Sequence, residues 1–159
     1  MKKAILVAAN PYRYYQVSPT RSIKELGDVE IHIQHRNLHG RVFWDMVPPG
    51  RLDTPWKHPE IDSGYFYISR DGVVRYRMSI VYIRRWKDID IDLVENYIPE
   101  FRRSYLNHYR ECMTYYAILI DDLHRMEHER KLNEFILLST MKPVERVQNY
   151  AIIVDPEQQ

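Results

Sequence analysis

The chain has 159 residues, 45% of them hydrophobic and 13% aromatic, and its formal net charge at pH 7 is +1. This length suits one domain with a hydrophobic core, and so small a net charge gives no global basic field that would by itself indicate nucleic-acid binding. The single cysteine, Cys112, excludes a disulfide framework and a cysteine zinc site, and the apolar run at 4–9 is too short for a signal peptide or a membrane span. We therefore expect a soluble, cytoplasmic protein.

Three strands are expected in the first third of the chain. Residues 4–9 are apolar on both faces of a strand, which is typical of the centre of a sheet. This strand ends at Asn10-Pro11, because proline cannot donate a ladder hydrogen bond. Residues 29–36 alternate between apolar and polar side chains and predict a half-buried strand, and residues 41–47 predict another.

Loops and one short helix are expected around these strands. Residues 12–15, Tyr-Arg-Tyr-Tyr, predict an aromatic and basic loop, and residues 22–26 a short helix that ends at Gly27. Residues 48–61 hold four prolines, one glycine and Trp56. That composition predicts a loop long enough to be functional.

Residues 63–86 predict a β-hairpin with a long second strand. Asp71-Gly72 supplies the turn, because glycine accepts the positive φ that tight hairpin turns require. Alternate residues from Val74 to Tyr82 share one face by the period of two. The other face begins with arginines and becomes apolar, so the strand is expected to be long and bent, as in small β-barrels.

The second half of the chain predicts both helices and strands. These are a helix over 92–97, a helix from 99 to about 111, a strand over 114–120, a helix over 126–138 and a strand over 150–154. The whole pattern predicts an α+β fold, a mixed β-barrel of six or seven strands with two or three flanking helices. We expect one domain over 1–155 and the start of a linker at 156–159.

Two partial metal motifs lack an essential component. His124-Arg-Met-Glu-His128 fits an inverted zincin motif, but only about thirty residues remain to provide a further ligand, and the surrounding run is charged as in a solvated helix. His58-Pro-Glu60 matches part of a deaminase motif, whose cysteine pair cannot be built from one cysteine. The sequence therefore predicts no metal site.

A nuclease-like pattern is also rejected. Asp121 or Asp122 with Glu129 and Lys131 resembles the carboxylates and lysine of a metal-dependent nuclease. In the helix expected here, Glu129 and Lys131 would diverge by about 200°. We therefore expect no catalytic residues, no cofactor and no enzymatic activity.

Aromatic and amide side chains occur where they could line a pocket. They are Asn10, Tyr12, Trp44, Trp56 and Tyr67. Aromatic walls can hold a flat base by stacking, which is worth about 1–3 kcal/mol per base, and asparagine can form two hydrogen bonds with a base edge. By residue type alone, Trp44 suits the hydrophobic core better than a pocket, whereas Trp56 suits either role.

Four arginines follow one strand and its end. They are Arg75, Arg77, Arg84 and Arg85. In one interpretation they neutralise phosphates beside the pocket. In the other they belong to an ordinary solvated face.

Four segments, in their order and spacing, carry a family resemblance. They are Ala8-Ala9-Asn10-Pro11, Gly40-Arg-Val-Phe-Trp44, Gly64-Tyr-Phe-Tyr-Ile-Ser69 and Gln148-Asn149-Tyr150. With them the chain resembles the PUA-like superfamily, in particular its EVE, YTH and ASCH branches. Within that superfamily it looks most like the N-terminal specificity domain of archaeal McrB-type, modification-dependent restriction GTPases.

The resemblance implies a PUA-like (EVE/YTH-like) barrel that binds DNA without catalysis. It implies base flipping, with a methylated base held in a pocket formed by Asn10, Tyr12, Trp44, Trp56 and Tyr67. It also implies a monomeric isolated domain, with oligomers formed through a separate AAA+ motor that the residues after 155 would join. The modification itself, N6-methyladenine, 5-methylcytosine or another, stays open.

Two alternatives remain beside a DNA-binding module. An RNA-binding module is one, because related PUA-like domains bind RNA and stacking does not depend on the sugar. A protein-interaction domain with a tyrosine-rich face is the other. The response of binding to salt separates nucleic acid from protein partners, because only phosphate contacts lose affinity steeply with salt.

Overall fold

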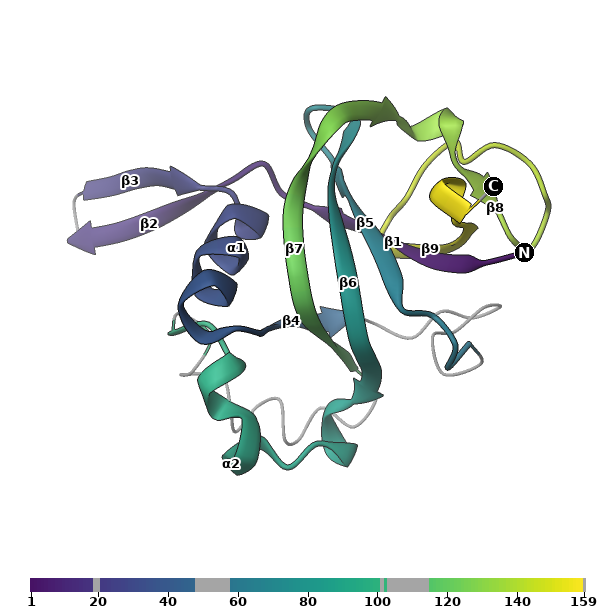
Figure 1. Ribbon diagram of the computed structural model, residues 1–159. Helices are drawn as coiled ribbons and strands as arrows, with labels where there is room; N and C mark the ends of the chain where they lie inside the picture. Colours follow the sequence, from purple (N-terminus) through teal and green to yellow (C-terminus); the bar gives the residue numbers. More distant parts are fainter. Residues whose placement is uncertain (19–20, 48–57, 101, 103–114, 159) are drawn as a thin grey trace.

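A mixed seven-stranded sheet forms the body of the protein, and a two-stranded hairpin projects from it (Figure 1). The computed structural model describes residues 1–18, 21–47, 58–100, 102 and 115–158. The sheet has the order β4-β7-β6-β5-β1-β9-β8, in which only β1 and β5 are parallel neighbours. The elements are β1 Lys3–Ala9, β2 Tyr12–Ser18, β3 Arg21–Leu26, α1 Asp28–His39, β4 Val42–Val47, β5 Ser63–Ile68, β6 Val73–Arg85, α2 Ile91–Val94, β7 Tyr116–Lys131, β8 Ile136–Leu137 and β9 Tyr150–Val154.

Strand β1 lies inside the sheet, as predicted. Ile5 and Val7 face a cluster that contains Trp44 and Phe66, which we call the α1-side cluster. Leu6 faces the opposite cluster, which contains Tyr65 and Phe135 and which we call the C-terminal cluster. A strand that supplies side chains to two buried clusters must be apolar on both faces, and this explains its sequence.

The predicted hairpin is confirmed as β5 and β6. Gly72 has φ of 72° in the turn, a conformation that glycine adopts without steric cost. The register between β6 and its neighbours shifts at several positions, so the side-chain faces change along the strand. Tyr76, Met78 and Ile80 face the α1-side cluster, whereas Val74 lies in the C-terminal cluster. The expectation that one face runs unbroken from 74 to 82 is therefore wrong.

Residues 12–18 and 21–26 pair as the two strands of a hairpin, where a loop and a short helix were expected. Tyr12 pairs with Leu26, and the antiparallel pairing reaches Ser18 opposite Arg21, with a register shift after Gln16. A five-residue segment is too short to nucleate a stable helix by itself, and the preceding tyrosine-rich segment provides a strand partner. Below the hairpin the chain crosses itself closely, because a Cβ atom at Gly27 would collide with the carbonyl oxygen of Pro11.

Residues 29–36, expected to be a strand, lie in helix α1, which contacts β4 and β7. The same alternating sequence also places Val29, His32 and Ile33 at helical spacing, and these side chains face the body of the protein. Gly40 ends the helix with φ of 85°. Gly40 is typical of the end of a helix, so this glycine indicated the helix, whereas the alternation of side chains wrongly indicated a strand.

Residues 126–138, expected to be helical, continue strand β7 to Lys131 and then form a 3-10 turn over Leu132–Glu134 and strand β8. Pairing with β6 extends from Arg85 opposite Tyr116 to Val73 opposite Lys131. The long pair arches together over the body (Figure 1). The ladder pairs Arg125 with Tyr76 and Arg130 with Val74, and the register shifts between these two pairs. The segment is thus held as a strand at its two ends, because tertiary pairing overrides intrinsic helix propensity.

The remaining predictions are confirmed in part. Residues 91–97 form α2 and a following 3-10 turn, and β9 matches the predicted final strand. Most of the helix expected at 99–111 lies outside the described residues. The described part has a mixed α+β fold with a strongly curved sheet, and none of its helices is long and apolar enough to cross a membrane.

The segment after β9 is fixed to the sheet by polar contacts. Asp155 is fully buried and accepts hydrogen bonds from Ser63 Oγ and Tyr65 OH, both at 2.7 Å. Two residues later, Glu157 lies 3.1 Å from the Nε atom of Arg77. The chain is thus anchored to the sheet as far as Glu157.

Candidate ligand pocket

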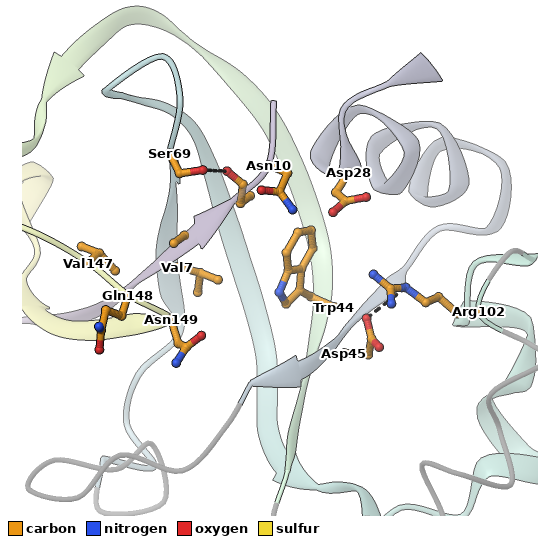
Figure 2. A pocket seen from close by; sticks show the side chains of 12 residues that line it. Val7, Asn10, Asp28, Trp44, Asp45, Ser69, Arg102, Val147, Gln148 and Asn149 are labelled. Atoms are coloured by element: carbon orange, nitrogen blue, oxygen red, sulfur yellow. Dashed lines mark hydrogen bonds and ion pairs between the residues drawn. The ribbon is translucent and has the colours of Figure 1, made fainter. Parts of the chain in front are cut away.

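A pocket of about 330 Å³ opens where β1 ends, α1 begins and β4 crosses below them. Figure 2 shows Trp44 near the centre of the lining residues, with Asn10 and Asp28 on one side and Asp45 with Arg102 on another. Gln148 and Asn149 approach from the segment before β9. The pocket therefore combines one aromatic ring with amide, carboxylate and guanidinium groups.

Trp44 belongs to both the core and the pocket. Its exposed fraction is 8%, and its ring centroid lies 4.6 Å from that of His32 and 4.5 Å from that of Phe66. His32 is itself fully buried, and its Nδ1 atom lies 2.6 Å from the carbonyl oxygen of Asp28. These contacts fix the indole, so that the part of it which lines the pocket is held in one orientation.

Asp45 and Arg102 form an ion pair in the pocket wall. The Nε atom of Arg102 lies 3.3 Å from Oδ1 of Asp45, whose side chain is only 5% exposed. In a regular strand, Trp44 and Asp45 would point to opposite faces. The register between β4 and β7 shifts after Trp44, and such a bulge can re-aim a side chain, which explains how both residues line one pocket.

The rim of the pocket carries three carboxamides, those of Asn10, Gln148 and Asn149. The backbone positions the last of these, because the carbonyl oxygen of Asn149 accepts a 2.9 Å hydrogen bond from Ala8 N–H. All three side chains are exposed at the rim. Each amide offers both a donor and an acceptor to a ligand.

The structure brings together two of the five predicted pocket residues, Asn10 and Trp44. Tyr67 packs against the C-terminal cluster, so it is not part of this pocket. Tyr12 begins β2, two residues after Asn10. Trp56 lies outside the described residues.

Arg75 and Arg77, predicted to bind phosphate, contact the protein's own carboxylates. Arg75 lies 2.8 Å from Asp71 and 2.6 Å from Glu129, and Arg77 lies 3.1 Å from Glu157. Neither arginine lines the pocket. A guanidinium that already contacts carboxylates contributes little attraction for phosphate, so we no longer expect these two residues to hold a nucleic-acid backbone.

Arg84 and Arg85 lie toward the other end of β6. The guanidinium of Arg84 lies 4.0 Å from the ring centroid of Tyr82, and Arg85 donates a 2.8 Å hydrogen bond to the hydroxyl of Tyr116. Neither residue lines the pocket. Phosphate binding by them stays a prediction.

The nuclease-like residues lie on a strand, so the reason given for rejecting them is wrong. Glu129 and Lys131 are two residues apart on β7, where they share a face. Asp122, however, lies opposite Ser79, whereas Glu129 contacts Arg75, four residues away along β6, which separates the two carboxylates by about 13 Å. Across the described part of the chain, no group of three or more His, Cys, Asp or Glu could hold a metal ion.

Sequence reasoning missed Asp45, Arg102 and Asp28 as lining residues. Asp45 had one visible signal, since it is the only charged residue in the otherwise apolar strand β4. Arg102 had none, because its approach to the pocket depends on tertiary structure. Comparisons with family models, with curated proteins and with solved structures found no match, so the pocket is interpreted from its own chemistry.

Proposed function

We propose that this domain is a non-catalytic nucleic-acid-binding module that accepts one methylated base, extruded from its strand, in the pocket above Trp44. The observation that carries the proposal is the combination of a fixed indole with three rim carboxamides around a small cavity. In its full form the proposal is a DNA reader for a modification-dependent restriction system.

The size and polarity of the pocket support a flat heterocycle as its ligand. A volume of about 330 Å³ lies at the lower end of the range for small-molecule pockets, which suits one base better than an extended ligand. Carboxamides such as that of Asn10 can hydrogen-bond the base edge, and an aromatic ring favours a flat partner. Extrusion of a base costs a few kcal/mol, which such contacts can offset.

The β2–β3 hairpin is the surface we propose for the nucleic-acid backbone. It begins two residues after Asn10 and ends two residues before Asp28, and both of these residues line the pocket. Residues 12–26 include three basic residues and one acidic residue, although the whole chain has a net charge of only +1. A basic arm at the pocket would follow the phosphates that flank an extruded base.

Competition binding at one physiological salt concentration tests the proposal. The ligands are an unmodified duplex, the same duplex with N6-methyladenine, one with 5-methylcytosine, and single-stranded RNA. Tighter binding to one methylated duplex would establish a reader and identify its base. Preference for RNA would favour the RNA-binding alternative, and absence of salt-sensitive binding to any ligand would reject both.

Removing the positive charges of the hairpin should weaken binding to every nucleic acid alike. In the triple variant Arg13→Gln, Arg21→Gln, Lys24→Gln, the slope of log affinity against log salt should fall by about 2–3, because each lost phosphate contact contributes about 0.9 for duplex DNA. Fluorescence anisotropy at four salt concentrations measures this slope.

A matched control removes charge from strand β6, which is not part of the hairpin. The double variant Arg75→Gln, Arg77→Gln should leave the slope nearly unchanged, because both side chains contact Asp71, Glu129 or Glu157 in the protein itself. If this double variant lowers the slope and the hairpin variant does not, the backbone lies on β6 and the hairpin assignment is wrong.

A further inference from the structure

Arg41 and Arg84 are exposed arginines that pair with no carboxylate among the described residues. Arg41 directly precedes β4, and Arg84 lies near the end of β6. Other arginines of the described part do form ion pairs, namely Arg36, Arg75, Arg77 and Arg102. The guanidiniums of Arg41 and Arg84 can therefore bind the anion of a ligand without giving up an ion pair within the protein.

Tyr82 brings these two arginines to one place on the surface. The Cζ atom of Arg84 lies over the ring of Tyr82, 4.0 Å from its centroid. Arg41 precedes Phe43 by two residues, and the ring centroid of Phe43 lies 6.2 Å from that of Tyr82. Phe43 and Tyr82 both pair with Leu119 of β7, one from each side. Three neighbouring strands thus fix the position of the cluster.

The charges that act on Tyr82 are all positive. Burial raises the pKa of its hydroxyl, and the guanidiniums of Arg84 and Arg41 oppose this rise. Among the described residues, no carboxylate contributes to the shift. Tyr65 and Tyr76 differ, because a hydrogen bond to a carboxylate helps burial to raise the pKa of each. The hydroxyl of Tyr82 keeps its proton at neutral pH and can donate it to an anion.

The three side chains of this cluster offer hydrogen-bond donors and positive charge. A guanidinium presents a planar fork of N–H groups and accepts no hydrogen bond, and the tyrosine hydroxyl adds a further donor. Phosphate oxygens match such a fork in both charge and geometry. In a domain that binds nucleic acid, the backbone supplies several phosphates beside the recognised base.

The place of the cluster in the fold suits a contact with the same nucleic acid. The β2–β3 hairpin ends two residues before α1, and Arg41 follows two residues after it. Hairpin and cluster therefore lie at opposite ends of α1 (Figure 1). A helix of 12 residues spans about 18 Å, which is about five base steps of duplex DNA.

We propose that Arg41, Tyr82 and Arg84 form a second binding site for backbone phosphates, separate from the β2–β3 hairpin. Both guanidiniums and the hydroxyl contact adjacent phosphates, about five base steps from those that the hairpin contacts. This inference rests on the proposed function for its ligand, a nucleic acid. It adds a region of contact that the pocket and the hairpin do not include.

The salt dependence of binding tests the two arginines. The full chain is titrated with an unmodified duplex and with the same duplex carrying N6-methyladenine or 5-methylcytosine. In the double variant Arg41→Gln, Arg84→Gln, the slope of log affinity against log salt should fall by about 1–2, because each lost phosphate contact contributes about 0.9. Raising salt from 50 to 200 mM should then weaken the wild type about three- to twelvefold more than the variant.

The double variant Arg75→Gln, Arg77→Gln is the matched control. It removes the same charge from two arginines that already contact carboxylates of the protein, so its slope should stay near that of the wild type. Equal slopes in the two double variants would overturn the proposal. Any effect would then come from the overall charge, and Arg41 and Arg84 would be solvated or would bind a carboxylate of a protein partner.

The variant Tyr82→Phe tests the hydroxyl, because it keeps the ring beneath Arg84. At constant salt it should bind every duplex about two- to tenfold more weakly, the cost of one lost hydrogen bond, while the salt slope stays unchanged. Thermal melting checks that each variant is folded. Wild-type affinity in a folded Tyr82→Phe variant would overturn the contact between hydroxyl and phosphate.

The outcomes separate this site from the base pocket. A lower slope in the Arg41 and Arg84 variant, with no wild-type preference for a methylated duplex, supports the phosphate site and rejects the base pocket. A methyl preference with an unchanged slope does the reverse. If the wild type shows no salt-sensitive binding to any duplex, both are rejected.

Discussion

Replacing Asp155 by alanine is expected to lower the free energy of unfolding by about 3–5 kcal/mol, the range seen when one partner of a buried charged network is removed. Asp155 is fully buried and accepts from the hydroxyls of Ser63 and Tyr65. Without the carboxylate, both donors stay buried with no acceptor, and the contact that fixes the chain after β9 is lost.

Urea denaturation of the variant and a matched control measures this effect. Asp62→Ala is a suitable control, because Asp62 is exposed and its carboxylate forms an ion pair with Lys2 at 3.1 Å. An exposed ion pair contributes about 0–1 kcal/mol. Similar losses in the two variants would show that the buried network does not stabilise the fold.

The same network predicts a dependence of stability on pH. Burial favours a raised pKa for Asp155, but the hydrogen bonds from Ser63, Tyr65 and the backbone N–H of Glu157 outweigh it and hold the pKa below its usual value. A group whose pKa is lower in the folded state stabilises the protein above its unfolded pKa, near 4 for aspartate, and this contribution is lost as pH falls through the folded value.

Burial and the bond to Asp155 also raise the pKa of Tyr65, so that its hydroxyl remains a donor over this range. Below about pH 4, unfolding midpoints in urea should therefore fall more steeply for the wild type than for Asp155→Asn. Parallel curves for the two proteins would contradict the assignment.

Replacing Trp44 by alanine should destabilise the protein by about 3–5 kcal/mol and abolish ligand selection. The indole packs between His32 and Phe66 and also lines the pocket, so one substitution leaves a cavity in the core and removes a wall of the site. Chemical denaturation gives the loss of stability.

A pair of milder variants separates the two effects. Trp86 is 1% exposed and packs against Phe43 with ring centroids 5.3 Å apart, away from the pocket. Trp44→Phe and Trp86→Phe should both lose some stability, but only Trp44→Phe should weaken binding to the preferred methylated duplex. Wild-type selectivity in Trp44→Phe would show that the indole serves the core alone.

The sequence predicted correctly those elements that depend only on residues close together in the chain. The turn glycine Gly72 and the period of two identified the β5–β6 hairpin, and the apolar run of β1 identified a strand inside the sheet. The strand predicted at residues 29–36 was wrong, because their alternation of apolar and polar side chains is also compatible with a helix. Residues 126–131 misled because their strand form depends on β6, which is far away in the sequence.

A lining residue of the pocket could be predicted from the sequence only where its residue type alone suggests that it binds a ligand. Asn10 and Trp44, which line the candidate pocket, could be selected because an amide after a strand and an indole are both recognisable in sequence. Tyr67 packs against the C-terminal cluster instead of lining this pocket, since the face to which a strand residue points depends on register. Trp44 and Asp45 line the same pocket because of the bulge in β4, and no local sequence pattern indicates that bulge.

The crossing of the chain below the β2–β3 hairpin has an evolutionary consequence. Tyr12 and Leu26 are paired neighbours, and the close approach of Gly27 to Pro11 closes the base of the hairpin independently of its length. The hairpin is thus built as an exchangeable module on a constant frame. Related chains could acquire new contacts by altering only this module, while the pocket beside it keeps its shape.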